Sequence, residues 1–337
     1  MATPAQWQWL LEAYRAMLPV KQIMKYLETE IGDNWTSWDF QQSLVDRVLR
    51  DSIVDKFPPH KSYVYRFIKT VTDTLEATNH EVCDDLMGEL MVFVLQSKLA
   101  QDAISDEDMH HVSFTVPRPS PAETTVVTCR VATVFNEVGL KIWEAGWFLA
   151  DYIVAFPEQF RGRVVLELGA GVGLTGLVLA KCRAHPARVV LSDYAPLVMQ
   201  NLRYNIELNA SDLDCPVDAV TLDWEKWEPE EDGDASMRPD ILLAGDCVYD
   251  VAAFPALMTV LHAFLGNDAG EEGTRREAIF ATTVRNKKTF QCFLDQLHQH
   301  RIEYDDITES ARQRMHQSIC IGATEQDIRL CKLYRAD

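Results

Sequence analysis

The chain has 337 residues, 47% of them hydrophobic, and a formal net charge of −19. This length accommodates one large domain with an appendage or two domains, and the apolar content supports a full core. The acidic balance lacks the basic footprint that sequence-independent nucleic-acid binding needs, so we expect no direct nucleic-acid partner. It suits a basic protein partner, or it serves solubility alone.

The eight cysteines form no C-x-x-C pair, and several lie inside apolar runs. This usage predicts reduced, buried thiols in a cytoplasmic protein. The nine histidines are scattered without the spacing of metal ligands, so we expect no metal site. We expect no signal peptide and no membrane partner, because no basic segment precedes an apolar run and no run reaches the length of a membrane span.

Residues 1–108 predict a helical accessory domain. Ser37 can cap a helix, and three apolar stripes at helical spacing follow, around 40–49, 63–71 and 86–95. Four tryptophans fit the core of such a bundle better than a partner surface, although both interpretations stay open. These are Trp7, Trp9, Trp35 and Trp38.

A β-ribbon is predicted next. Residues 102–108 form an acidic linker, and the β-rich segments 112–116 and 125–129 flank a run with three prolines. A helix over 142–156 follows, with Trp143 near its start. We place the beginning of the second domain, 109–337, at this ribbon.

The stretch 164–180 predicts a ligand site. The apolar-rich residues 164–168 predict a buried parallel strand, a glycine loop follows at once, and 174–180 predicts a helix. This is a nucleotide-binding layout. Gly169 permits a tight turn, and Gly171 lets the backbone approach a ligand. Leu174 stands where a dinucleotide fingerprint needs its last glycine, which argues against NAD.

A second signal lies at the end of the next strand. Asp193 follows the apolar run 189–191 and comes 20 positions after Gly173. An acid at this strand end sits beside the glycine loop and can accept both hydroxyl protons of a ribose.

The rest of the chain continues the alternation of strands and helices. We expect strands at 217–222, 241–244 and 278–284, helices at 197–208, 254–265 and 289–298, and two closing antiparallel strands at 302–307 and 328–334. This pattern predicts a doubly wound α/β sheet, which binds ligands at the carboxyl ends of its strands. Acidic residues fall at several such ends: Glu167, Asp193, Asp223 and Asp246.

Two tryptophans and one short box are candidates for chemistry. Trp224 directly follows a strand and can stack on an adenine or pack in the core, and Trp143 is a similar case. Asp246-x-x-Tyr249 ends the fourth strand beside the glycine loop. An unpaired carboxylate there can orient an incoming ammonium, and a tyrosine face can hold such a cation. Asp246 could instead cap the following helix.

Together these residues resemble the seven-β-strand, class I protein-lysine methyltransferases. The resemblance rests on Gly139-Leu140-x-x-Trp143, the glycine run to Gly176, Leu222-Asp223-Trp224, the Asp246-x-x-Tyr249 box and Thr283-Val284-Arg285-Asn286. It implies a seven-stranded Rossmann-like sheet and S-adenosylmethionine as cofactor. With its helical extension, the chain most resembles the group whose protein substrate is eukaryotic elongation factor 2.

The resemblance also implies site residues. The catalytic pair is Asp246 and Tyr249. The cofactor contacts that it implies are Trp143, Gly169, Ala170, Gly171, Trp224 and Gly245. Glu167, Asp193 and Ala244, from the ends of the predicted strands, complete the predicted cofactor-binding set. The chain departs from its relatives before Trp143, where Asn136-Glu137-Val138-Gly139 replaces Gly-Thr-Thr-Gly. This replacement changes the local loop contacts.

Two other hypotheses stay open at this point. The enzyme could methylate another protein lysine or a small amine. Alternatively, the domain could be a scaffold whose helical region docks a partner. An intact glycine loop and Asp-x-x-Tyr box disfavour the scaffold, because an unused site has no physical need for them.

Overall fold

The structure, a computed structural model, describes residues 2–99, 109–118, 123–133, 137–228, 239–266, 276–316, 319 and 326–335. The chain divides into two compact units. The helical unit comprises Met1–Phe114 with Arg130–Phe135, and the sheet unit comprises Thr115–Cys129 with Asn136–Asp337. The predicted linker 102–108 and most of the loops at 228–234 and 266–273 lie outside the described residues. The predicted domain boundary after residue 108 stays a prediction.

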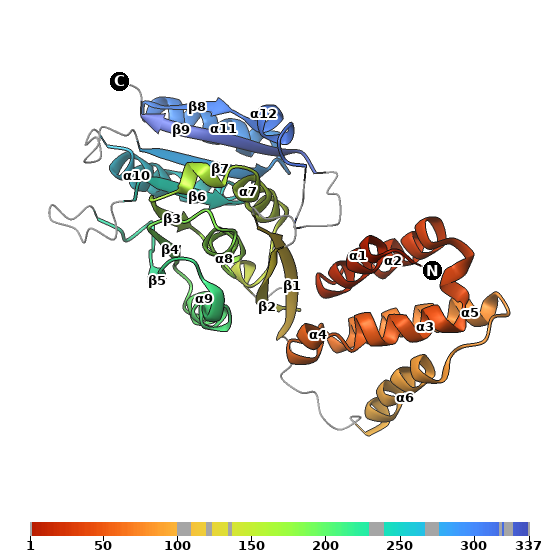
Figure 1. Ribbon diagram of the computed structural model, residues 1–337. Helices are drawn as coiled ribbons and strands as arrows, with labels where there is room; N and C mark the ends of the chain where they lie inside the picture. The colour runs from red at the N-terminus through yellow and green to blue at the C-terminus, as the bar shows by residue number, and fades with distance from the viewer. Residues whose placement is uncertain are drawn as a thin grey trace. The chain divides into compact units, whose positions relative to one another are not determined.

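The helical unit contains six α-helices in the described residues (Figure 1). They are α1(Pro4–Arg15), α2(Val20–Tyr26), α3(Trp38–Leu44), α4(Ser52–Lys56), α5(Lys61–Ala77) and α6(Asp84–Leu99). The expected cap is confirmed, because the Ser37 side chain accepts a hydrogen bond from the Phe40 backbone at the start of α3. Trp35 is buried, but Trp38 is 43% exposed and does not belong to the core.

A partly buried ion pair connects two helices of this unit. Arg15, at the end of α1, lies 2.6 Å from the Asp51 carboxylate. The same carboxylate caps α4 by accepting from the Ile53 and Val54 backbones. One acid therefore satisfies both a buried cation and the free N–H groups of a helix start.

The predicted ribbon is confirmed as β1(Met109–Pro117) and β2(Thr124–Ala132), a two-stranded sheet whose residues are divided between the two units. Within the sheet unit, the buried Lys181 amine donates to the Val126 carbonyl at 2.8 Å and lies 2.6 Å from Asp212. The Thr125 hydroxyl also donates to Asp212. This pairing compensates for the cost of burying the lysine charge.

The sheet unit is built on a seven-stranded sheet in the order β5-β4-β3-β6-β7-β9-β8. Its strands are β3(Val164–Leu168), β4(Arg188–Asp193), β5(Val217–Thr221), β6(Ile241–Gly245), β7(Glu277–Thr283), β8(Ile302–Asp306) and β9(Ile328–Arg335). β9 runs antiparallel to both of its neighbours. The chain reverses its direction of travel across the sheet between β3 and β6, which are adjacent and parallel.

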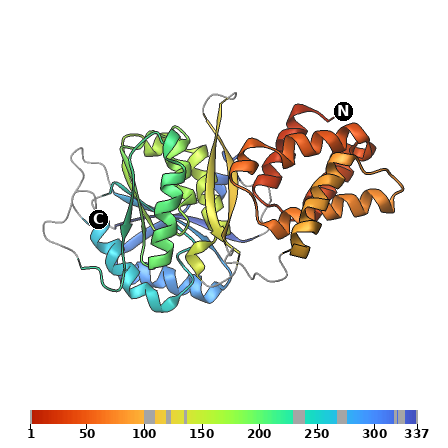
Figure 2. The same cartoon turned by 90° about the horizontal axis from the view of Figure 1, so that it is seen from below.

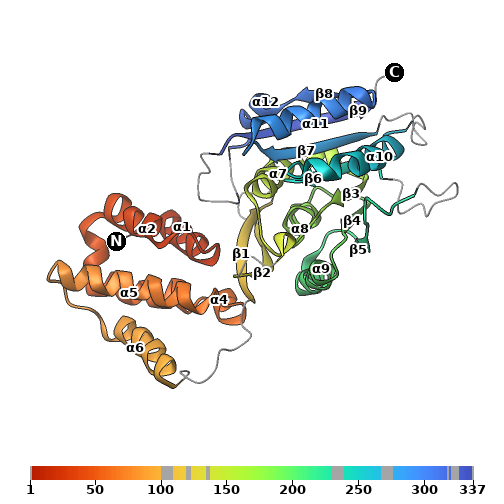
Figure 3. The ribbon, with the colours of Figure 1, turned by 180° about the vertical axis from the view of Figure 1, so that it is seen from behind.

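Helices cover both faces of this sheet (Figures 2 and 3). α7(Glu144–Ala155), α8(Leu174–Lys181) and α9(Pro196–Leu208) lie on one face, and α10(Phe254–Phe264) and α11(Lys287–Gln299) lie on the other. The doubly wound fold predicted from the alternating pattern is confirmed. The short α12(Thr308–Arg312) was not anticipated.

Alternation along β3 decides which side chains reach the core. Leu166 and Leu168 join a buried cluster with Phe254 of α10 and Phe293 of α11. Glu167, between them, points to the opposite face, because successive side chains of a strand alternate. None of the helices in the described residues has both the length and the apolar character that a bilayer crossing requires.

Candidate active site

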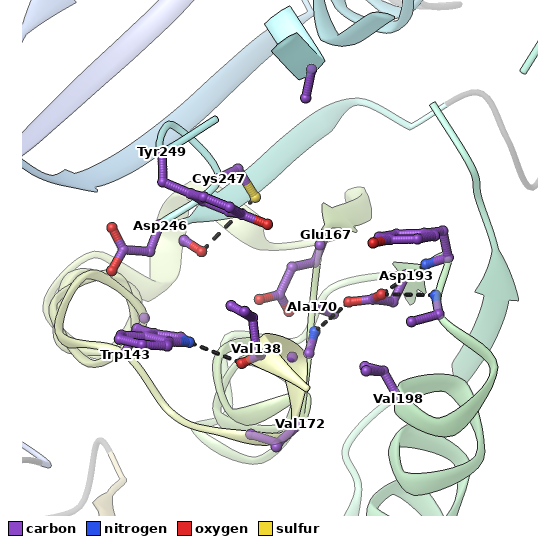
Figure 4. A pocket seen from close by; sticks show the side chains of 18 of the residues that line it. Val138, Trp143, Glu167, Ala170, Val172, Asp193, Val198, Asp246, Cys247 and Tyr249 are labelled. Carbon is purple, nitrogen blue, oxygen red and sulfur yellow. Dashed lines mark hydrogen bonds between the residues drawn. The ribbon is translucent and has the colours of Figure 1, made fainter. Parts of the chain in front are cut away.

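A cavity of about 720 Å³ opens at the carboxyl ends of β3, β4 and β6 (Figure 4). This is the edge where the winding reverses between β3 and β6, the usual ligand position in such sheets. Ten of the eleven predicted site residues line it: Trp143, Glu167, Gly169, Ala170, Gly171, Asp193, Trp224, Gly245, Asp246 and Tyr249.

Ala244 is the exception. It is fully buried in the cluster that faces α10 and α11, so the structure does not bring it to the cavity. Its neighbour Gly245 points to the other face, where an added Cβ would lie 3.1 Å from the Gly146 Cα of α7.

The glycine loop is shaped by its own backbone. Gly169 and Gly171 have φ angles of 60° and 56°, which glycine adopts at no steric cost. A Cβ on Gly171 would lie 2.9 Å from the Gly139 carbonyl oxygen. A side chain at position 171 would therefore clash with the main chain of Gly139 before it could block a bound ligand, which is the obstacle that the sequence suggested.

Glu167 is a buried carboxyl at the base of the cavity. Its Oε2 accepts from the Gly176 backbone N–H at 2.9 Å, in the first turn of α8. Burial raises the pKa of Glu167 to about 8. The side chain is therefore mostly protonated at neutral pH, in contrast to an ordinary surface glutamate.

Asp193 is held by three backbone N–H groups. Its Oδ2 accepts from Gly171 at 3.1 Å, and its Oδ1 accepts from Tyr194 at 2.7 Å and Ala195 at 3.3 Å. Burial raises the pKa of this carboxyl above its usual range. A carboxylate offers about four acceptor positions. One acceptor position, on Oδ2, has no hydrogen-bond partner in the part of the chain that the structure describes, so it can accept a hydroxyl proton from a ligand.

The two tryptophans of the cavity are fixed differently. The Trp143 indole donates to the Val138 carbonyl at 3.0 Å, and the Arg285 guanidinium carbon lies 5.2 Å from its ring centre. Trp224 lines the cavity and also packs against the buried cluster beneath α10 and α11. Core packing and a ligand face are thus both available to this side chain.

Asp246 is not the unpaired carboxylate expected from the sequence. Its Oδ2 lies 2.9 Å from the Arg285 guanidinium, and its oxygens accept from the Thr283 backbone and hydroxyl at 3.1 and 3.2 Å. It does not cap the next helical turn either. Asp250 does so, by accepting from the Ala252 backbone.

Three further residues in or beside the cavity carry contacts that matter for its charge or packing, and none of them was a predicted site residue. Arg285, which the sequence analysis named only within the run Thr283-Val284-Arg285-Asn286, lines the cavity and also pairs with Glu144 at 2.7 Å. The buried Cys247 thiol donates to the Leu168 carbonyl at 3.2 Å and lines the cavity. Glu144 carries no sequence signal except its place at the start of a helix, which many glutamates share.

The cavity fits S-adenosylmethionine on several independent grounds. It provides a glycine cradle that tolerates no Cβ, a carboxylate with a free acceptor position, and two indole rings. No cluster of His, Cys, Asp and Glu suited to a metal ion occurs among the described residues.

A family model described as "Lysine methyltransferase" matches residues 129–300, just over half of the chain. The chain therefore belongs to the lysine methyltransferase family. Together with the sheet and the glycine loop, this membership makes it an S-adenosylmethionine-dependent protein-lysine methyltransferase that acts on a protein substrate.

Several relatives resemble most of the chain. An uncharacterised protein of Dictyostelium discoideum is 26% identical and covers 95% of this chain and 94% of its own. The human protein-lysine N-methyltransferase EEF2KMT is 28% identical over 80% of both chains. Among solved structures, a TehB-like SAM-dependent methyltransferase from Corynebacterium glutamicum matches with a TM-score of 0.39 at 15% identity, over 56% of this chain and 88% of that one.

Proposed function

We propose that this enzyme methylates a lysine of eukaryotic elongation factor 2. The observation that carries the proposal is the extent of the similarity to EEF2KMT, whose name refers to that factor. The aligned 80% of this chain is more than the sheet unit alone comprises, so the similarity continues into the helical unit. Relatives from Bos taurus and Chaetomium thermophilum extend over similar shares, 83% and 81%.

We propose that the helical unit, predicted as an accessory domain over residues 1–108, contributes to recognition of the protein substrate. A protein acceptor requires an interface of useful size. This unit has its own groove of about 430 Å³, lined by Trp7, Arg47 and Arg50 among others. The predicted second domain, 109–337, would carry the chemistry.

In this proposal the cofactor lies along the glycine loop. Gly169, Ala170 and Gly171 border its path, Asp193 receives a ribose hydroxyl, and Trp143 and Trp224 offer aromatic faces. S-adenosylmethionine supplies an electrophilic methyl group on a sulfonium sulfur. Glu167 supports the cradle by fixing the first turn of α8.

The acceptor lysine would approach the other end of the cavity. Asp246 attracts and orients the ammonium group, and Tyr249 flanks it with an aromatic face. The amine must lose its proton before it attacks, because an ammonium has no lone pair. Tyr249 lines the cavity and is 60% exposed, so this end of the cavity is open to water. The proton released by the amine can pass to that water.

A cytoplasmic location follows from this proposal, because a translation factor is met there. The seven cysteines that the structure describes are free thiols, and five of them are buried. Such thiols are compatible with a reducing compartment.

The test is methyl transfer from tritiated S-adenosylmethionine into a whole eukaryotic lysate, followed by the same assay on recombinant elongation factor 2. We expect one labelled band at the size of the factor and one methylated lysine in its mass spectrum. Label found only in other bands would contradict the proposal that elongation factor 2 is the substrate. This alternative has some support, because 36% identity to the calmodulin-lysine N-methyltransferase of Arabidopsis thaliana extends over 32% of the chain.

A further inference from the structure

One cation joins two carboxylates at the acceptor end of the cavity. Nη2 of Arg285 donates to Asp246 at 2.9 Å and to Glu144 at 2.7 Å. The guanidinium also lies over the Trp143 ring, with its carbon 5.2 Å from the ring centre. Figure 4 shows Trp143 and Asp246 on the same side of the cavity. Arg285 and Asp246 follow the carboxyl ends of β7 and β6, and Glu144 begins α7, so the fold itself assembles the cluster.

Asp246 cannot easily leave this arrangement. Its φ angle is 60°, a conformation that only a few non-glycine residues adopt. Its backbone N–H donates to Ala281 at 2.8 Å, and Thr283 binds both carboxylate oxygens. The carboxylate is therefore fixed toward Arg285, and its charge is countered there.

The cluster has consequences for an amine that must be bound and then deprotonated. Two carboxylates and one guanidinium leave one net negative charge. A stronger negative field would bind the ammonium better but also hold its proton, because nearby negative charge favours the charged form of an amine. A weaker field would release the proton but bind the amine poorly.

We propose, building on the function above, that Arg285 is a positioning residue that limits the negative field on the acceptor lysine, so that the amine binds as a cation and still loses its proton near neutral pH. Glu144 is the opposing member of the balance. The guanidinium does not contact the reacting atoms in this proposal; it acts through Asp246 and Glu144.

Other charged or titratable groups border the same space and form a constant background. Along the cavity wall these are Glu137, Lys141, Glu167, Asp193, Tyr194, Asp223, Glu225, Lys226, Cys247, Tyr249 and Asp250. Lys287 and Lys288 follow Arg285 in the chain, at the start of α11. Arg285 differs from the other cations, Lys141, Lys226, Lys287 and Lys288, because only Arg285 is bonded to Asp246 in the described residues.

The first test is the pH profile of single-turnover methyl transfer to recombinant elongation factor 2, at saturating cofactor. For Arg285→Gln we expect the rising limb to move to higher pH by about one unit, which costs about tenfold in rate at pH 7. The KM for the factor should fall at the same time. A purely structural role for Arg285 would raise KM or lower the rate at every pH alike.

Glu144→Gln provides a test of the opposite sign. Loss of this carboxylate should move the profile to lower pH and raise KM. The double variant Glu144→Gln/Arg285→Gln restores one net negative charge and should return the profile close to that of the wild type. Arg285→Lys keeps the positive charge, so its pH profile should also stay close to that of the wild type.

A matched control is Arg188→Gln, which removes an arginine paired with Asp218 at 2.8 Å on the far edge of the sheet. Its profile should not move. A readout without turnover is calorimetric binding of two peptides that span the methylated lysine, one with norleucine in its place. Arg285→Gln should widen the affinity difference between them.

Unshifted profiles in Arg285→Gln and Glu144→Gln, or shifts of the same sign, would overturn the inference while leaving the function intact. A wild-type enzyme that does not methylate elongation factor 2 would instead refute the substrate proposal. In that case the pH profiles with the labelled lysate protein still test the role of Arg285.

Discussion

The two ends of the cavity are held together by different kinds of contact. At the glycine-loop end, Glu167 and Asp193 accept from backbone N–H groups that lie at most 22 positions away in the chain. At the β6–β7 end, Arg285 joins side chains that lie 39 and 141 positions away. The first end is a shaped backbone cradle, and the second is a balance of side-chain charges.

This difference separates binding from chemistry. Backbone donors cannot move without unfolding the loop, so the first end suits the constant recognition of one cofactor. Side-chain charges can be tuned one at a time, so the second end suits an acceptor whose protonation matters. Substitutions at the two ends should therefore change different measured quantities.

The largest effect is expected for Asp246→Asn, which keeps the shape of the side chain and removes its charge. We expect methyl transfer to fall 100-fold or more, about 3 kcal/mol of barrier. Cofactor affinity should stay within a few-fold. The single-turnover rate checks the loss of methyl transfer, and calorimetry checks the cofactor affinity. Asp218→Asn, which removes the carboxylate that pairs with Arg188, is the control. An active variant with a normal melting temperature would remove Asp246 from the mechanism.

Asp193→Ala should have the next largest effect, and this effect should be on cofactor affinity and not on the rate of methyl transfer. Loss of hydrogen bonds to a charged acceptor costs roughly 1.5–3 kcal/mol each, so cofactor affinity should fall by between ten- and a hundredfold in calorimetry. The melting temperature should also drop, because Gly171, Tyr194 and Ala195 lose their acceptor. NAD should not compete with the cofactor. Displacement by NAD at a similar concentration would contradict the assignment of the loop.

Tyr249 should give a smaller and graded effect. A cation–π contact contributes about 0.5–2 kcal/mol. We therefore expect Tyr249→Ala to raise the KM for the protein substrate by up to about thirtyfold, while Tyr249→Phe keeps the ring and stays near the wild type. Tyr304→Ala, an exposed tyrosine of β8, is the control. Equal losses in Phe and Ala would assign the role to the hydroxyl instead.

Glu167→Gln should change activity least. Its main effect should be on how the free energy of unfolding depends on pH. The pKa of Glu167, about 8 in the folded protein, exceeds that of an unfolded glutamate, so the folded state retains the proton. The stability from this group is present at low pH and is lost as pH rises from about 4.5 to 8. Denaturation measured at pH 5 and at pH 8.5 should show that the free energy of unfolding falls less between these two pH values in Glu167→Gln than in the wild type or in the control Glu207→Gln.

The sequence predicted the glycine-loop end well because its signals are local. The strand 164–168 has the bounds of β3, and Asp193 follows the loop at the expected strand end. Two details failed. Alternation along β6 turns Ala244 into the core and leaves only Gly245 at the cavity. The main-chain contact that excludes a side chain from Gly171 comes from Gly139, which a pattern of residues 164–180 cannot reveal.

The β6–β7 end was predicted only in part. The Asp-x-x-Tyr box marked Asp246, but its partners come from segments that the sheet brings together over long distances in the chain. No spacing rule pairs Glu144 with Arg285, because that pairing depends on how α7 packs beside β6 and β7. Pairwise charge contacts of this kind need the tertiary structure.

The most direct measurement of the separation between the two ends is a double-variant cycle on Asp193→Ala and Asp246→Asn. Cofactor affinity and single-turnover rate are measured for the wild type, both single variants and the double variant. If the ends act independently, the loss of affinity from Asp193→Ala is the same in both backgrounds, within about 0.5 kcal/mol. A cofactor affinity that collapses in Asp246→Asn alone, or a loss from Asp193→Ala that disappears in its presence, would contradict the account.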